Sequence, residues 1–229
     1  MNITKENIDK LNALLDHGLV KDLGVPEPGK MCVEAAVCAA LGLPHGDDPG
    51  CVIDSLRNVK IALNDSDMWD SNQSRAEGLR RLAIAQIGTR GAINEGKFAR
   101  RVVTLAIRVV VPIALRVLAD ETDGEHAQAL RDIADKCEAN PIKENARQAE
   151  EVADAYPAEA TDATYAAYNA VLYATIAADA YTAANVTYAA TYAAHATGCE
   201  TVLRDFAEGI VQILIDMKAP GCAWLDDHV

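Results

Sequence analysis

The chain has 229 residues, of which 50% are apolar and 24% are charged, and its formal net charge is -13 at pH 7. This length and composition predict a globular protein with a sizeable core and exclude a disordered chain. The acidic charge argues against a general nucleic-acid binder. The polar, charged start of the chain predicts no secretion signal, and six cysteines without such a signal indicate reduced thiols, so we expect a cytoplasmic protein.

Apolar residues at helical spacing predict five helices in the first 120 residues. Thr4 is placed to cap the first helix, which should end near Gly18, and Ser71 or Asn72 is placed to cap the fourth. The second to fifth helices are expected at residues 30–41, 52–63, 72–87 and 94–119.

The fifth expected helix is the most apolar part of the chain. Arg108 and Arg116 interrupt it, which argues against a membrane span, and Pro112 should kink it. An unpaired guanidinium would be costly to bury here, so we expect Arg108 to meet a carboxylate, a carbonyl, an opening to water or a bound anion.

The second half of the sequence continues the helical pattern and becomes low in complexity. Amphipathic helices are expected at 123–138, 142–155 and 199–217. Between them, residues 158–197 hold 17 alanines and six of the seven tyrosines, a composition that predicts a long helix packed closely on a partner through its alanines. No strand pattern occurs, so the expected fold is an all-α bundle of about eight or nine helices. We expect one domain, 1–229, with 1–120 and 121–229 as the alternative division.

The charges are unevenly distributed along the chain. Residues 75–116 contain nine Lys or Arg and two Glu, so this segment carries +7 inside an acidic protein. On the fifth helix, Lys97, Arg101 and Arg108 share a face. Lys30 follows Pro-Glu-Pro-Gly at an expected helix start, where backbone N–H groups can accept phosphate. Pairing of these cations with the acidic second half is an equally weighted alternative.

The stretch from Gly29 to Cys51 concentrates the other candidates for chemistry. Cys32, in the first turn of a helix, could act as a nucleophile with His45 as base and Asp47 or Asp48 as orienting group. A buried structural thiol is the favoured alternative. His45, Asp47 and Asp48 could also bind a hard cation, but a capped turn is favoured, and the cysteine spacing matches no usual zinc site. We therefore expect no cofactor.

The sequence resembles a family of small proteins encoded by bacteriophages and prophages. The resemblance lies in residues 29–49, with the motif GKMCVEAAVCAALGLPHGDDP, in RAEGLRRLAIAQIG at 75–88 and in MKAPGCAW at 217–224. It implies a phage setting and, by itself, no activity.

Three functional hypotheses are compatible with these patterns. The first is a phage accessory protein that sequesters a phosphate-bearing small molecule, in its most specific form a nucleotide-derived signal of host immunity, in the host cytosol. The residues expected to neutralise phosphate or stack on a base are Lys30, Trp69, Arg80, Arg81, Arg101 and Arg108. The second is a hydrolase that uses Cys32 or a metal, although we favour a protein that is not an enzyme. The third is an acidic module that binds a host protein. The alanine-rich helix and the apolar tail would also suit a homo-oligomer.

Overall fold

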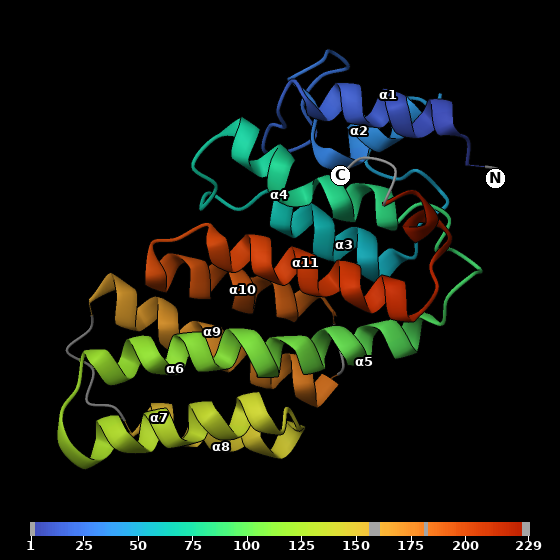
Figure 1. Cartoon of the computed structure of the whole chain (residues 1–229). Coiled ribbons are helices and arrows are strands. Elements are labelled where there is room, and N and C mark those ends of the chain that lie inside the picture. Colours follow the sequence, from blue (N-terminus) through green and yellow to red (C-terminus); the bar gives the residue numbers. More distant parts are fainter. Residues whose placement is uncertain (1–2, 156–160, 181–182, 226–229) are drawn as a thin grey trace. The chain divides into compact units, whose positions relative to one another are not determined.

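The computed structural model describes residues 3–155, 161–180 and 183–225. These residues form eleven α-helices, one π-helical segment and one 3-10 helix, and they contain no strand beyond an isolated bridge between Gly24 and Met31 (Figure 1). The all-α prediction is confirmed. The helices are α1 Lys5–Leu15, α2 Val33–Ala40, α3 Asp54–Asn64, α4 Asn72–Ala85, α5 Glu95–Leu105, α6 Val111–Asp120, α7 Gly124–Ala139, α8 Lys143–Asp154, α9 Asp162–Ala180, α10 Ala183–Thr197 and α11 Thr201–Asp216.

The chain divides into two compact units. The first unit comprises residues 1–98 and 207–229, so it joins the N-terminal segment to the C-terminal segment, and the second unit comprises residues 99–206. The alternative boundary expected at residue 120 falls within the second unit, at the end of α6.

The first unit is built from α1 to α4, the C-terminal part of α11 and the 3-10 helix η2, Pro220–Trp224. Capping boxes begin α1 at Thr4 and α4 at Ser71, as the sequence predicted. η2 packs on α4, so the apolar tail folds back on the unit. Gly221 makes this possible, because a Cβ at this position would overlap the carbonyl oxygen of Ile84.

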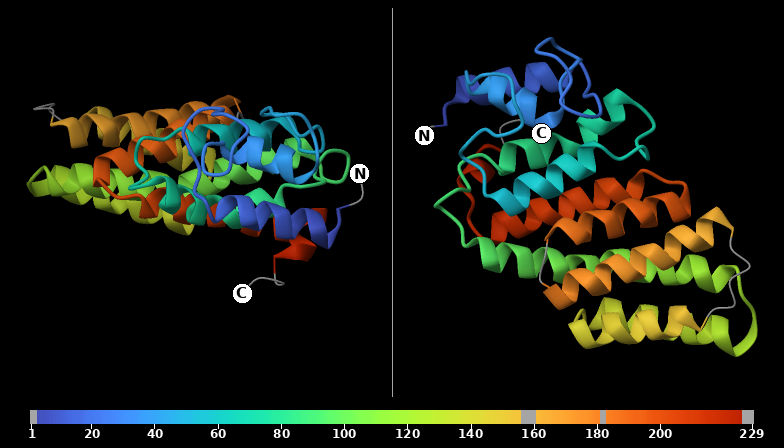
Figure 2. Two further views of the ribbon diagram at one scale, coloured as in Figure 1. Left: turned by 90° about the horizontal axis from the view of Figure 1, so that it is seen from above. Right: turned by 180° about the vertical axis from the view of Figure 1, so that it is seen from behind.

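The second unit is a bundle of α6 to α10 with the adjoining parts of α5 and α11. The alanine-rich segment forms α9 and α10, which run side by side and make the most extensive helix contact (Figure 2). Buried alanines occupy the facing surfaces and let the two backbones approach closely. They are Ala166, Ala167, Ala170, Ala174, Ala177 and Ala178 on α9, and Ala189, Ala190, Ala193 and Ala194 on α10.

A π-helical segment, Ala106–Val110, joins α5 to α6 and precedes Pro112. Proline has no N–H and its ring clashes with the carbonyl four residues earlier, which here belongs to Arg108. A wider π turn is one way for a helix to accommodate this break. Among the described residues, Glu95–Asp120 is the one helix whose length and composition would allow it to cross a membrane, and 61% of its most apolar window is buried within the protein.

Candidate functional site

The thiol of Cys32 is a buried helix cap. Cys32 precedes the first residue of α2, and its Sγ accepts a hydrogen bond from the backbone N–H of Ala35 at 3.3 Å. The residue is 4% exposed, and burial raises the pKa of its thiol. The N–H groups at the helix start favour the thiolate, but desolvation of the thiolate outweighs them. At neutral pH the sulfur is therefore protonated and a poor nucleophile.

The residues expected to assist Cys32 have other contacts. His45 Nε2 lies 3.3 Å from the backbone oxygen of Gly24, and Asp47 lies 3.7 Å from the guanidinium of Arg57. Asp48 accepts a hydrogen bond from the N–H of Gly50 at 2.8 Å, which is the capped turn that the sequence favoured. In the described ranges, no three His, Cys, Asp or Glu side chains are grouped so that they could hold a metal ion.

The least expected feature of the first unit is an ion pair in its core. Glu34 of α2 and Lys60 of α3 are both fully buried, with Glu34 Oε1 2.9 Å from Lys60 Nζ. Gln86, also fully buried, donates from Nε2 to Glu34 Oε2 at 3.3 Å. Burial raises the pKa of Glu34 and lowers the pKa of Lys60, and each partner's charge opposes the shift of the other. We infer an ionised pair that is costly to separate.

A small cavity lies beside α2 in the same unit. Its volume is about 130 Å³, and it is lined by Asp22, Leu23, Cys32, Val33, Asp47, Ile61, Asn64 and Asp65. Asn64 shapes it: its Oδ1 accepts the N–H of Val33 at 3.1 Å and its Nδ2 donates to the carbonyl of Val20 at 3.0 Å. Three carboxylates and no cation line this cavity, so its charge disfavours a phosphate group.

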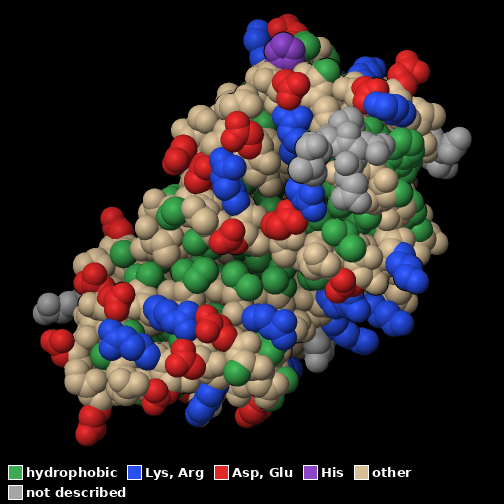
Figure 3. Space-filling view, viewed as in Figure 1, with side chains coloured by type: hydrophobic (Ala, Val, Ile, Leu, Met, Phe, Trp, Pro, Cys, Tyr) green, Lys and Arg blue, Asp and Glu red, His purple; other side chains and the backbone are tan. Residues whose placement is uncertain are grey.

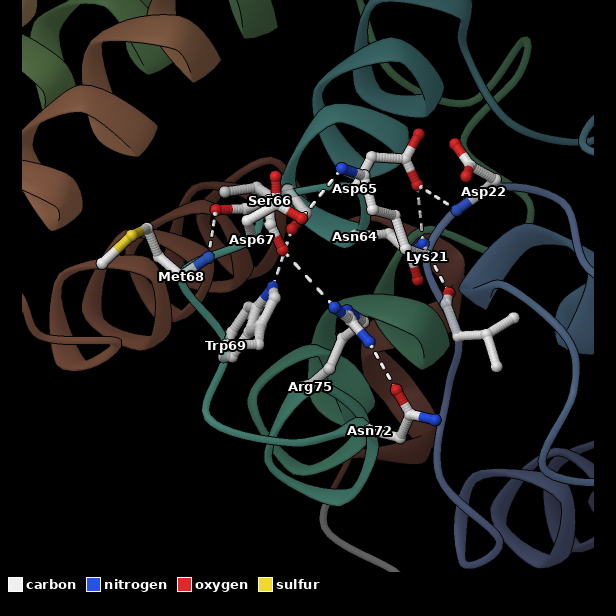
Figure 4. Close-up of polar contacts among 12 residues, drawn as sticks. Lys21, Asp22, Asn64, Asp65, Ser66, Asp67, Met68, Trp69, Asn72 and Arg75 are labelled. Atoms are coloured by element: carbon white, nitrogen blue, oxygen red, sulfur yellow. Dashed lines mark hydrogen bonds and ion pairs between the residues drawn. The ribbon is translucent and has the colours of Figure 1, made fainter.

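Trp69 is part of the network that holds the loop after α3 (Figure 4). Its side chain is 6% exposed, and its indole N–H donates to the carbonyl of Leu63 at 2.8 Å. Nearby, the buried guanidinium of Arg75 donates to the carbonyl of Leu19 and to Asn72 Oδ1, each at 2.9 Å. The indole face expected to stack on a base is therefore buried in the protein.

Three of the cations expected to bind phosphate form ion pairs within the first unit. Their partners are Glu27 for Lys30 at 2.7 Å, Asp16 for Arg80 at 2.7 Å and Glu208 for Arg81 at 3.0 Å. Lys30 also lies before the cap of α2 rather than in its first turn. Figure 3 shows the same pattern on the face drawn there, where Lys and Arg side chains lie beside Asp and Glu side chains. These three residues are thus paired within the chain, but not with residues 120–200 as the alternative expected, because their partners are Glu27, Asp16 and Glu208.

The basic residues of the helix at 95–120 lie at the surface. Arg101 and Arg108 are both exposed, so Arg108 is open to water although its neighbours in sequence are apolar. Among the residues that the structure describes, Arg108 has no ion-pair or hydrogen-bond partner. Arg116 instead binds Asp135 and Glu138 of α7, which raises its pKa.

A groove of about 540 Å³ opens next to this helix in the second unit, and no sequence pattern predicts it. We call it the second-unit groove. It is lined by Arg100, Val103, Thr104 and Ile107, by Pro141, Ile142, Lys143 and Glu144 at the start of α8, and by Ala178. The spacing of Arg100, Thr104 and Ile107 in the sequence indicates that they share one face of a helix. It does not indicate that this face lines a groove.

Comparisons of the chain with family models, with curated proteins and with solved structures find no match. A function must therefore be inferred from the chemistry of the described residues.

Proposed function

We propose that the protein binds a small phosphate-bearing molecule in the second-unit groove and retains it without turnover. The composition of the groove is the observation that carries the proposal. Two cations, Arg100 and Lys143, and one carboxylate, Glu144, stand among apolar side chains, including Ile142, which is 47% exposed. A volume of about 540 Å³ is in the range of small-molecule sites. Apolar walls with few charged groups suit a molecule that has both a flat organic part and a phosphate.

The ion pairs around the groove leave Lys143 able to change partner. Asp179 accepts from both Lys143, at 2.9 Å, and Arg147, at 3.0 Å. Such solvent-accessible pairs are weak, because water and salt screen them. Lys143 can therefore turn towards a phosphate while Arg147 still neutralises Asp179. Arg108, further along the same helix as Arg100, is another exposed cation of the second unit.

Two expectations from the sequence give the proposal its more specific form. The first is that the protein is not an enzyme, which favours retention of the ligand over hydrolysis. The resemblance to phage and prophage proteins favours a nucleotide-derived signal of host immunity as the ligand, held in the host cytosol. This ligand identity rests on the resemblance alone.

Isothermal titration of the purified protein tests the proposal. The probes are inorganic phosphate, adenosine, adenosine monophosphate and a cyclic dinucleotide. We expect the phosphate-bearing nucleosides to bind more tightly than adenosine. Arg100→Gln and Lys143→Gln should each weaken this binding about tenfold, because each removes a charge-assisted contact. Lys136→Gln, an exposed residue of α7 outside the groove, is the matched control. Equal affinities in all three variants, or no binding of any phosphate probe, would overturn the proposal.

A further inference from the structure

Four tyrosines gather on one surface of the paired helices α9 and α10. The ring centroid of Tyr173 lies 5.4 Å from that of Tyr188 and 5.5 Å from that of Tyr192, and the planes of Tyr173 and Tyr192 are only 9° from parallel. Tyr165 precedes Tyr173 by eight residues on α9, which places the two near the same side of that helix. We call the surface formed by Tyr165, Tyr173, Tyr188 and Tyr192 the tyrosine face.

The tyrosine face is open to solvent. Tyr165 is 61% exposed and Tyr188 is 53% exposed, and Ile176, on the same side of α9, is 40% exposed. Tyr173 contacts Tyr188 and Tyr192 across the two helices, and buried alanines lie on both helices. The exposed parts of Tyr165 and Tyr188 remain available to a partner. Clustered, exposed aromatic side chains are typical of interaction surfaces, whereas singly scattered ones need no explanation.

The charges around the tyrosine face indicate what it can bind. The chain has no Lys or Arg from residue 148 to 203. Neither α9 nor α10 therefore contributes a Lys or Arg, and the cations that bind α9, Lys143 and Arg147 of α8, are paired with Asp179. Asp162, which is exposed and lies one turn before Tyr165 on α9, contributes a carboxylate. An aromatic surface with a neighbouring carboxylate, on helices without Lys or Arg, attracts a positive group more than a phosphate.

We propose that the tyrosine face docks an arginine-bearing segment of a partner protein. A guanidinium can lie flat on a tyrosine ring and at the same time donate hydrogen bonds to a carboxylate, which an ammonium group does less well. Tyr173 and Tyr192 are half-buried and stack on each other, so the exposed ring of Tyr188, tilted beside Tyr173, is the one that offers a face for such a contact. A nucleobase could stack here, but neither α9 nor α10 supplies a Lys or Arg for its phosphates. A second copy of the chain would bring the same acidic surface against itself.

Peptide titration tests this inference independently of the ligand in the groove. The probes are two fluorescent peptides of equal length and charge, with Gly-Ser spacers and either five arginines or five lysines. Fluorescence anisotropy at low salt should show the arginine peptide binding about fivefold more tightly than the lysine peptide, because guanidinium stacks better on tyrosine.

Substitutions on the face locate the binding. Tyr188→Ala should remove the preference for arginine, and Tyr188→Phe should retain most of it, because the ring remains. Leu23→Ala, an exposed apolar residue of the first unit, is the control. Circular dichroism would establish that each variant is folded. Equal binding of both peptides, or unchanged binding in folded Tyr188→Ala, would overturn the inference. So would a dimer that Tyr188→Ala dissociates, since the face would then belong to a second copy.

Discussion

Glu34 and Lys60 form an ion pair, 2.9 Å from oxygen to nitrogen, in which neither side chain reaches solvent. The pair links α2 to α3 inside the first unit. Gln86, the residue directly after α4, donates a hydrogen bond to Glu34 beside the pair. A buried ion pair adds little net stability compared with apolar residues of similar size. Removing only one of its two partners is strongly destabilising, because the other charge is then buried without a counter-charge. The pair therefore constrains how the motif-bearing helix α2 can pack.

Lys60→Met should destabilise the protein strongly. The substitution leaves a buried carboxylate without its cation, and such changes cost about 3–5 kcal/mol. Urea denaturation followed by circular dichroism measures the loss. The double variant Glu34→Gln/Lys60→Met should recover most of it, since no buried charge remains. Lys10→Met, at an exposed position on α1, is the matched control. A loss in Lys60→Met no larger than in this control would contradict a buried charged pair.

The loss in Lys60→Met should depend on pH. Burial already raises the pKa of Glu34, and removing Lys60 removes the main opposing effect. A carboxyl whose folded-state pKa exceeds its unfolded value stabilises the protein below the unfolded pKa, and this contribution is lost as the pH rises through the folded pKa. The stability deficit should thus be smaller at pH 5 than at pH 8. If the urea midpoints differ from wild type by the same amount at both pH values, Glu34 is not the group responsible.

The six cysteines should differ in reactivity. Cys199 is exposed, whereas Cys38 and Cys137 are buried, with thiol pKa values raised to about 11 by burial. Alkylation with iodoacetamide at pH 8, followed by peptide mass spectrometry, should label Cys199 first and leave Cys32, Cys38 and Cys137 unmodified until urea is added. Labelling of Cys32 as fast as that of Cys199 would indicate an accessible thiolate and would favour the hydrolase hypothesis.

Gly221→Ala should detach the C-terminal 3-10 helix from α4. The added Cβ would overlap the carbonyl of Ile84 and lie 2.8 Å from the carbonyl oxygen of Ala85. We expect a loss of about 1–3 kcal/mol in unfolding free energy, as for other overpacked sites. The control is Gly46→Ala, where the nearest atom to a Cβ lies 3.9 Å away. Similar urea midpoints for the two variants would mean that the tail does not pack as described.

Local sequence patterns predicted the helices, but they did not predict which charged side chains are buried or paired, for physical reasons. Thr4 and Ser71 were identified as caps because capping depends on a few adjacent residues. Whether a charge is buried depends on the partner across the fold. Arg108, surrounded by apolar neighbours, is exposed, while Lys60 is fully buried. The burial of Lys60 could have been inferred from the sequence. Lys60 follows the buried Leu56 by four residues and so lies on the core face of α3.

The second-unit groove was beyond prediction for a similar reason. Arg100 and Lys143 are 43 positions apart in the sequence and come together only through the packing of the helices. The composition of residues 158–197 predicted an alanine-rich helix that packs on a partner. It did not predict the clustering of the tyrosines, because that depends on how α9 and α10 pair.

Native mass spectrometry can establish whether the second-unit groove retains a phosphate-bearing molecule. The protein is measured as purified from bacterial cells and again after incubation with a nucleotide mixture. We predict an adduct that denaturation releases as an intact phosphorylated molecule. The adduct should be lost in Lys143→Gln and kept in Lys136→Gln. A ligand-free mass under both conditions, a released molecule without phosphate, or a ligand recovered in cleaved form would contradict retention of such a molecule in the groove.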